Sequence, residues 1–334
     1  MTVAVSAVEW LLESGEPGIV AQAKRDLLGE AAPAEAARVL EGPKVRALLA
    51  GQQPDGGFGV NVYGKWGGAH WRLVSLVELG VPAGEPRCLA AAETVLAWLT
   101  GKGHRDRIQV INGLTRRCGS QEGNALAVCC RLGLAGDPRV RLLAESLVEW
   151  QWPDGGWNCD RRATGRRSSF NESLAPMWGL FEYFDATGET AAWDAARRTA
   201  ELLLDHRLFR SLRTGDVIAD DWLLPHYPPY WHYDAPQALL ILSRMGLAGD
   251  PRAADAIDAL VARRRADGTW RAVRPWWRPP GARATNVEAV DWGPVVPHQL
   301  VTLNALRILA AQERGEPTRT RLPLGSTSAN SRIP

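Results

Sequence analysis

Apolar residues recur at helical spacing along most of the chain. The spacing predicts helices at residues 7–12, 20–28, 39–49 and 71–79, where apolar side chains return every three or four positions. The alternation of apolar and polar residues that marks strands is scarce. The pattern therefore predicts an all-α fold.

Several predicted helices end in the same way. Gly80, Gly133 and Gly246 each follow an apolar run, and a proline stands two to five residues further on. The first two glycines are 53 residues apart and the last two 113, about two periods of similar length. Further copies fit residues 178–184, before Gly188, and residues 300–309.

A second repeated feature stands between the helices. The stretch Gln151-Trp152-Pro153-Asp154-Gly155-Gly156-Trp157 has a copy at residues 52–58 and a shortened one at residues 266–270. Proline fixes φ, aspartate bonds to backbone N–H groups, and glycine adopts positive φ. We expect a sharp turn between helices at each copy. Two long irregular stretches, residues 210–233 and 274–297, are rich in Trp, Tyr, Pro and Asp, which favours a functional role.

Through these turns the chain resembles the squalene–hopene cyclase and protein prenyltransferase β-subunit superfamily, over residues ~40–312. Three stretches are similar to a bacterial branch of it: residues 10–13, residues 155–159 with 168–172, and Trp231-His232-Tyr233-Asp234. The resemblance implies an (α/α) toroid of five or six helix pairs around an apolar cavity. We expect one domain at residues 1–312, with atypical helices at 1–40 and a loose tail at 313–334.

Composition excludes several classes of function. The net charge of +2 and the lack of a long basic run argue against a nucleic-acid partner. Five cysteines without a C-x-x-C pair fit a reduced cytoplasm. No run of ~20 apolar residues gives a membrane signal. The 15 tryptophans are unusual, and we expect many of them to line a cavity.

Cyclases of this superfamily protonate an alkene with an aspartate of Asp-x-Asp-Asp. Asp220 and Asp221 are the nearest match, although Ile218 replaces the first aspartate. Adjacent carboxyl groups in a dry pocket push their pKa values apart, and aromatic faces stabilise the cation. Candidate aromatics are Tyr227, Tyr230, Trp231, Tyr233, Trp276, Trp277 and Trp292. Alternatively, Asp220 caps a helix and Asp221 is solvated.

The segment 231–234 supplies a second catalytic candidate. Asp234 is placed to cap the apolar helix that follows, with Pro236 in its first turn. His232 is then a candidate general acid or base, in proton transfer with Asp234. Other residues predicted to open cavity-facing helices are Trp66, His70, Trp71, Asn171, Glu172 and His298.

Prenyl transfer is the alternative chemistry of the resemblance. The resemblance implies that the zinc-ligand positions of the prenyltransferase β-subunit correspond to Arg167-Ser168-Ser169 in this chain. Serine does not bind zinc. No Asp-Asp-x-x-Asp magnesium motif is present, so no metal or cofactor is predicted. Four arginines of the same segment are candidates to bind a diphosphate: Arg161, Arg162, Arg166 and Arg167. Alternatively, they form a solvated face.

The sequence thus predicts a terpenoid-cyclase-like isomerase or lyase that acts on an isoprenoid or similar apolar molecule. Two alternatives stay open: a prenyl-diphosphate-dependent prenyltransferase without the usual zinc site, and a non-catalytic small-molecule binder or scaffold.

Overall fold

The computed structural model describes residues 6–273 and 275–314, and helices dominate this part of the chain, as the all-α prediction requires. The bounds are α1 (Ala7–Leu12), α2 (Pro17–Ala23), α3 (Pro33–Ala37), α4 (Pro43–Leu49), α5 (Ala69–Glu78), α6 (Pro86–Thr100), α7 (Lys102–Arg105), α8 (Gly119–Arg131), α9 (Pro138–Trp150), α10 (Phe170–Thr187), α11 (Thr190–Asp205), α12 (Ala235–Arg244), α13 (Ala254–Val261) and α14 (Gln299–Arg314). Short π or 3₁₀ turns occupy Lys24–Leu28, Val39–Glu41, Asp220–Leu223 and Pro251–Ala253.

A small hairpin departs from the all-α prediction. Strands β1 (Gln109–Ile111) and β2 (Leu114–Arg116) pair antiparallel around Asn112-Gly113. Both turn residues have positive φ, 52° and 75°, the geometry that Asn-Gly favours in two-residue hairpins. Asn112-Gly113 is typical of such a hairpin, but the prediction from hydrophobic spacing did not use it.

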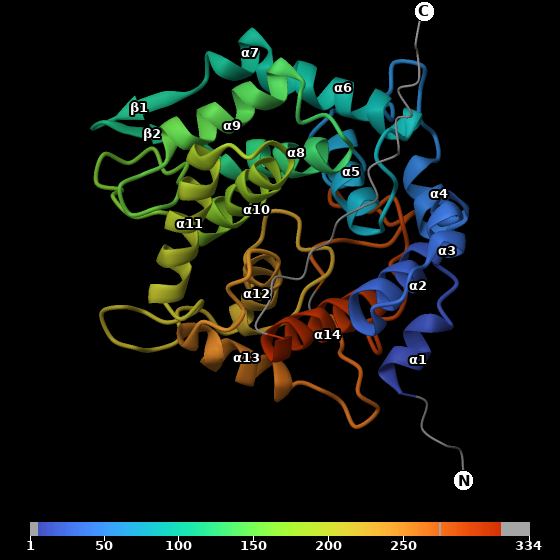
Figure 1. The fold of residues 1–334 in the computed structure, drawn as a ribbon. Coiled ribbons are helices and arrows are strands. Elements are labelled where there is room, and N and C mark those ends of the chain that lie inside the picture. Colours follow the sequence, from blue (N-terminus) through green and yellow to red (C-terminus); the bar gives the residue numbers. More distant parts are fainter. Residues whose placement is uncertain (1–5, 274, 315–334) are drawn as a thin grey trace, which may run out of the picture.

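Six helices, α2, α5, α8, α10, α12 and α14, are called here the central helices. Contacts link α5 to α8, α8 to α10, α10 to α12, α12 to α14 and α14 to α2. Gln22 in α2 also donates from Nε2 to the backbone carbonyl of Glu78 at the end of α5, at 3.2 Å. Figure 1 displays the central helices around the middle of the molecule.

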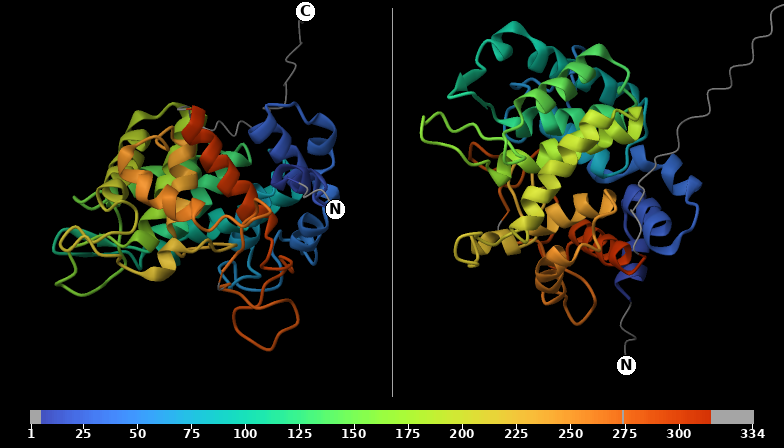
Figure 2. Two further views of the ribbon diagram at one scale, coloured as in Figure 1. Left: turned by 90° about the horizontal axis from the view of Figure 1, so that it is seen from below. Right: turned by 60° about the vertical axis from the view of Figure 1, so that its left-hand side comes forward.

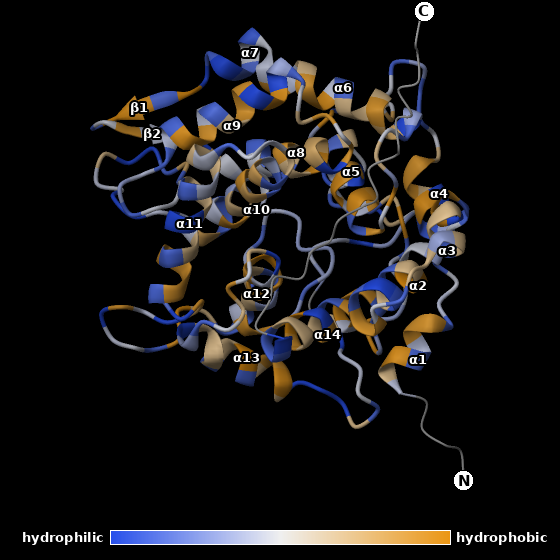
Figure 3. Cartoon of the chain, viewed as in Figure 1, coloured by the Kyte–Doolittle hydropathy of each residue, from blue (hydrophilic) through white to orange (hydrophobic). Residues whose placement is uncertain are grey.

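The other long helices pack outside the central ones. Helix α6 contacts α5, α9 contacts α8, α11 contacts α10, and α13 contacts α12. The long loops, including those before α5, α8, α10 and α14, project on one side of the molecule (Figure 2, left). Hydrophobic residues are prominent in α1, α4 and α5, whereas the short α7 is largely hydrophilic (Figure 3).

Helices α8 and α10 approach each other closely because small residues face one another. A Cβ atom at Gly123 of α8 would lie 2.3 Å from the backbone nitrogen of Pro176 in α10. A Cβ at Gly179 of α10 would lie 2.4 Å from the carbonyl oxygen of Gly123. Real Cβ contacts are not this short, so glycine is required at both positions for the helices to pack as they do.

The repeated turns share one hydrogen-bonding scheme. The side chains of Gln52 and Gln151 donate to the carbonyls of Gly56 and Gly155, at 3.0 and 2.9 Å. Each glutamine also donates to a backbone carbonyl of the next outer helix, in α6 or α11. The first glycine of the pair in each full copy, Gly56 or Gly155, and Gly268 in the third copy have φ between 80° and 96°. The prediction of sharp turns at these sites is confirmed.

The predicted helix ends are also confirmed. Gly80, Gly133, Gly188 and Gly246 all follow a central helix and have φ of 78–86°, as expected of a glycine that ends a helix. At the C-terminus, α14 runs through Arg314, so residues 313 and 314 are helical and not part of a loose tail. The rest of that predicted tail, residues 315–334, lies outside the described residues. None of the described helices has the length and apolar character needed to cross a membrane.

Candidate functional site

A pocket of about 620 Å³, measured out to its open mouth, lies among the central helices. Its walls come from α5, α8, α10 and α12 and from the loop at residues 227–232 that precedes α12. The lining residues are Val74, Ser75, Glu78, Asn124, Asn171, Leu174, Ala175, Trp178, Tyr227, Pro228, Pro229, Tyr230, Trp231, His232, Gln237, Ile241 and Arg244. The pocket runs from this loop, at the start of α10 and α12, to an ionic cluster where α5 and α12 end.

The loop end of the pocket is aromatic. The ring of His232 is stacked between Trp231 and Trp276, with centroids 4.0 Å from each. Tyr230 beside it stacks on Trp66, with centroids 3.8 Å apart and an interplanar angle of 4°. Trp66 and Trp276 do not themselves line the pocket but support the rings that do. Of the irregular stretch at residues 210–233, the part at 227–232 therefore faces the interior.

His232 is a neutral imidazole at neutral pH. Burial lowers its pKa to about 4, with Lys65 and His226 acting in the same direction against a hydrogen bond to Pro229. Its Nδ1 lies 3.3 Å from the carbonyl oxygen of Pro229, which only accepts, so Nδ1 carries the proton of this contact. In this tautomer Nε2 has a free lone pair and is chemically a base.

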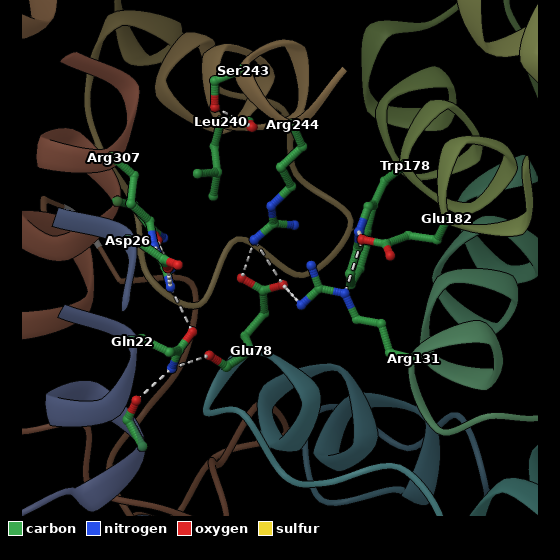
Figure 4. A network of polar contacts seen from close by, with 12 residues as sticks. Gln22, Asp26, Glu78, Arg131, Trp178, Glu182, Leu240, Ser243, Arg244 and Arg307 are labelled. Carbon is green, nitrogen blue, oxygen red and sulfur yellow. Dashed lines mark hydrogen bonds and ion pairs between the residues drawn. The ribbon is translucent and has the colours of Figure 1, made fainter. Parts of the chain in front are cut away.

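The opposite end of the pocket contains buried charges (Figure 4). Glu78 of α5 accepts from Arg244 of α12 at 3.0 Å and from Arg131 of α8 at 3.2 Å. Arg131 also pairs with Glu182 of α10 at 2.9 Å. Two positive and two negative groups thus join four central helices. We call Glu78, Arg131, Glu182 and Arg244 the ionic cluster.

The ionic cluster keeps Glu78 ionised. Burial by itself would raise the pKa of Glu78, but the guanidinium groups of Arg244 and Arg131 outweigh it and lower the pKa to about 2. Trp178 in the pocket wall lies against both arginines, whose guanidinium carbons are 5.5 and 5.9 Å from its ring centroid. Its indole N–H donates to Glu182 at 2.8 Å. This end of the pocket is therefore polar but close to electrically neutral.

The structure corrects the predicted pairing of His232 with Asp234. Asp234 pairs instead with Nδ1 of His226, at 3.1 Å, and both side chains are buried. Asp234 also caps α12, because its other oxygen accepts from the N–H of Gln237 at 2.7 Å. The sequence hypothesis overlooked His226, since a histidine eight residues before an N-cap gives no local pattern.

The predicted acids Asp220 and Asp221 lie apart from the lining residues of the pocket. Both belong to the short 3₁₀ turn before the pocket loop, where Asp220 is exposed and Asp221 is half-buried. The neighbouring Trp222 packs on Phe170 and Tyr233, neither of which lines the pocket. The structure therefore does not place the aspartate pair where it would protonate a molecule in the pocket.

The remaining predicted site residues fall into two sets. Asn171, Tyr227, Tyr230 and Trp231 line the pocket, as expected. Behind this layer, away from the lining, lie Trp66, His70, Trp71, Glu172, Tyr233, Trp276, Trp277, Trp292 and His298. Some fix the loop: Trp277 donates to the carbonyl of Tyr227 at 2.9 Å, and Tyr233 donates to that of Leu208 at 2.6 Å.

Two buried histidines in this second layer are neutral. Burial, and to a smaller degree His104, lowers the pKa of His70 to about 3, and its ring packs against Tyr63, Trp71 and Trp98. Burial and then Lys44 lower the pKa of His298 to about 4. His70 is therefore packed as an aromatic ring, whereas His298 and Trp292 line a separate pocket beside α2 and α14.

The four arginines predicted to clamp a diphosphate are exposed. Arg162 forms an ion pair with Asp160 at 2.9 Å, and none of the four lines the pocket. These arginines therefore form a solvated face, which was the alternative prediction. Near it, however, a different group assembles: Cys118, Cys159 and Glu172 form a cluster of possible metal ligands within the described residues.

Sequence reasoning missed several lining residues, including Glu78, Asn124, Trp178 and Arg244. It also missed Glu288, a buried carboxyl group in the loop before α14 whose pKa is raised by burial to about 7. Glu288 does not line the central pocket. Compared with known protein families and with curated protein sequences, the chain matches none.

Proposed function

We propose that the protein is a terpenoid-cyclase-like enzyme that binds an isoprenoid or a similar apolar molecule in the central pocket and acts on it by proton transfer. The proposal includes the architecture that the resemblance implies, a single (α/α) toroid of tandem helix hairpins. The observation that carries it is the neutral His232, held flat between Trp231 and Trp276 in the wall of the pocket.

The lining of the pocket suits such a ligand. The space enclosed among the lining side chains is about 50 Å³, so an isoprenoid would have to displace side chains of the wall or extend through the open mouth. The apolar chain would contact Val74, Leu174 and Ile241. The faces of Tyr230 and Trp231 would stabilise positive charge that develops on the ligand. Asn124, Asn171 and Gln237 supply polar groups at separate points of the wall.

The protonation states decide which proton transfer is favoured. Glu78 is the only carboxyl group among the described lining residues, and it is ionised at neutral pH. No described lining residue is therefore a strong acid. His232 has the lone pair to accept a proton. We accordingly assign to His232 the removal of a proton from the carbon next to a cationic centre, which forms an alkene and leaves the proton on Nε2. The cation would come from an isoprenoid substrate that ionises by losing its own anionic leaving group, since the described lining residues supply no acid.

Replacing His232 by glutamine is expected to lower turnover about 100-fold or more while ligand affinity changes only a few-fold, because general bases contribute on this scale. Turnover would be measured by product analysis with isoprenoids from monoterpene to triterpene length. Activity should also be level around neutral pH and fall as the pH approaches 4, where His232 becomes protonated.

His206→Gln is the matched control. His206 is also half-buried, its Nδ1 lies 2.7 Å from a backbone carbonyl, and its ring packs on Phe170, yet it does not line the pocket. Its turnover should equal that of the wild type. Equal turnover of His232→Gln would remove His232 from the mechanism. Ligand binding by the wild type without any product would favour the non-catalytic binder.

A further inference from the structure

Two thiol groups and a carboxyl group converge where α8 and α10 begin. Cys118 is the N-cap residue of α8, Glu172 is in the first turn of α10, and Cys159 lies in the loop that follows the turn at residues 151–157. Their sulfur and oxygen atoms all lie within 4.8 Å of one another. Since 41 residues separate the two cysteines, the fold and not a local motif brings them together.

The spacing is close to that of a tetrahedral metal site. Sγ of Cys159 lies 3.7 Å from Oε1 of Glu172. A zinc ion with bonds of ~2.3 Å to sulfur and ~2.0 Å to oxygen holds the two atoms about 3.5 Å apart. Since all three ligand atoms lie within 4.8 Å of one another, side-chain shifts of at most about 1 Å close the site around an ion.

Hydrogen bonds from Ser120 orient the carboxyl group of Glu172 toward the cysteines. Oε2 of Glu172 accepts from the backbone N–H and the hydroxyl of Ser120, at 3.1 and 2.7 Å. These bonds direct Oε1 toward Cys159, in the manner of the outer-shell contacts that fix metal ligands.

The carboxyl group of Glu172 also lacks an ion-pair partner. It is 8% exposed, no Lys, Arg or His of the described residues forms an ion pair with it, and the nearby Arg117 pairs with Glu122 instead. Buried charges are normally paired with another charge or bound to a metal. Both cysteines are half-buried, so an ion has access from solution.

We propose that Cys118, Cys159 and Glu172 bind one divalent ion of the zinc class. Thiolates select Zn²⁺ and Co²⁺ over Mg²⁺ and Ca²⁺, which prefer oxygen. Three protein ligands leave the fourth position of a tetrahedral site for water or another small ligand. The ligands differ from the positions 167–169 that the resemblance would use, and the site does not depend on the function proposed for the central pocket.

Titration of the reduced, metal-free full-length protein with Co²⁺ tests the proposal. We expect one equivalent to bind with the sulfur-to-cobalt charge-transfer absorption that thiolate ligands produce. Excess Mg²⁺ should not compete, whereas Zn²⁺ should displace the cobalt. Cys118→Ser and Cys159→Ser are expected to lose most of this absorption. Ser120→Ala, which removes a hydroxyl that orients Glu172, should weaken binding about 10- to 100-fold.

Cys130→Ser is the matched control, because Cys130 is equally half-buried but lies outside the cluster. It should bind Co²⁺ as the wild type does, and circular dichroism would check that each variant is folded. A wild-type protein that binds no Co²⁺ through sulfur would overturn the proposal. So would a reduced protein that takes up no metal yet forms a Cys118–Cys159 disulfide on oxidation, since the pair would then be a redox element.

Discussion

Replacing Gly123 by alanine is expected to lower the free energy of unfolding by about 3 kcal/mol, the upper part of the range for overpacked cores. The added methyl group would lie 2.3–2.6 Å from backbone atoms of Ala175 and Pro176 in α10. Backbone atoms cannot rotate away, so α8 and α10 must separate along their contact. The higher helix propensity of alanine, ~1 kcal/mol, offsets only part of this loss. Chemical denaturation followed by circular dichroism measures the change.

The matched control is Gly103→Ala in α7. Gly103 is also helical but exposed, and a Cβ there meets no atom within 4 Å. This variant should be as stable as the wild type or slightly more stable, because only the propensity term acts. If Gly123→Ala were equally well tolerated, α8 and α10 would not pack as closely as described.

Replacing Glu78 by glutamine should also destabilise the protein, by about 3–5 kcal/mol. The change keeps the shape of the side chain but leaves Arg131 and Arg244 with Glu182 as the remaining carboxylate of the ionic cluster. Both arginine side chains are no more than 7% exposed, and uncompensated charges that are buried in this way are costly. Denaturant unfolding at neutral pH gives the value.

The same residue predicts a pH dependence. The pKa of Glu78 is lowered in the folded protein to about 2, below its value in an unfolded chain, ~4.3. The folded state therefore binds the proton less well, and stability from this group is present above pH ~4 and is lost as the pH falls toward 2. The contribution of Glu78 to the free energy of unfolding is about 3 kcal/mol. The Glu78→Gln variant should not show this loss of stability at acid pH.

Glu93→Gln is the control for charge removal at a surface. Glu93 forms a bidentate pair with Arg139, but its side chain is 59% exposed, so the loss should stay below about 1 kcal/mol. Equal losses for Glu78→Gln and Glu93→Gln would contradict the ionic cluster as a buried network.

Much of the helical framework could be predicted from the sequence because its signals are local. Glycines that end helices and the Gln-x-x-Asp-Gly-Gly turns depend on backbone conformations that few residues adopt. Part of the ionic cluster could also have been predicted from the sequence. Glu78, Arg131 and Arg244 each stand two residues before the glycine that ends a central helix. Equivalent positions of a repeat are brought together, and their opposite charges indicated a contact.

The candidate site was less predictable, because its pairings join segments that are distant or irregular. The prediction of Asp234 as an N-cap is confirmed. Its side chain contacts His226 and not the nearby His232, because of the path that the loop between them follows. Likewise, nothing near Cys118 in the sequence points to Cys159. Asp220 and Asp221 resembled a catalytic pair in sequence, yet the loop turns its later residues, not these, toward the pocket.

Photo-crosslinking with a diazirine-bearing prenyl probe tests the central claim, that the central pocket binds an apolar molecule. The account predicts adducts on lining residues such as Leu174, Tyr230 and Ile241, located by mass spectrometry and suppressed by excess unlabelled isoprenoid. Adducts found only at exposed apolar residues such as Val110 and Leu212, and not suppressed by the competitor, would contradict it.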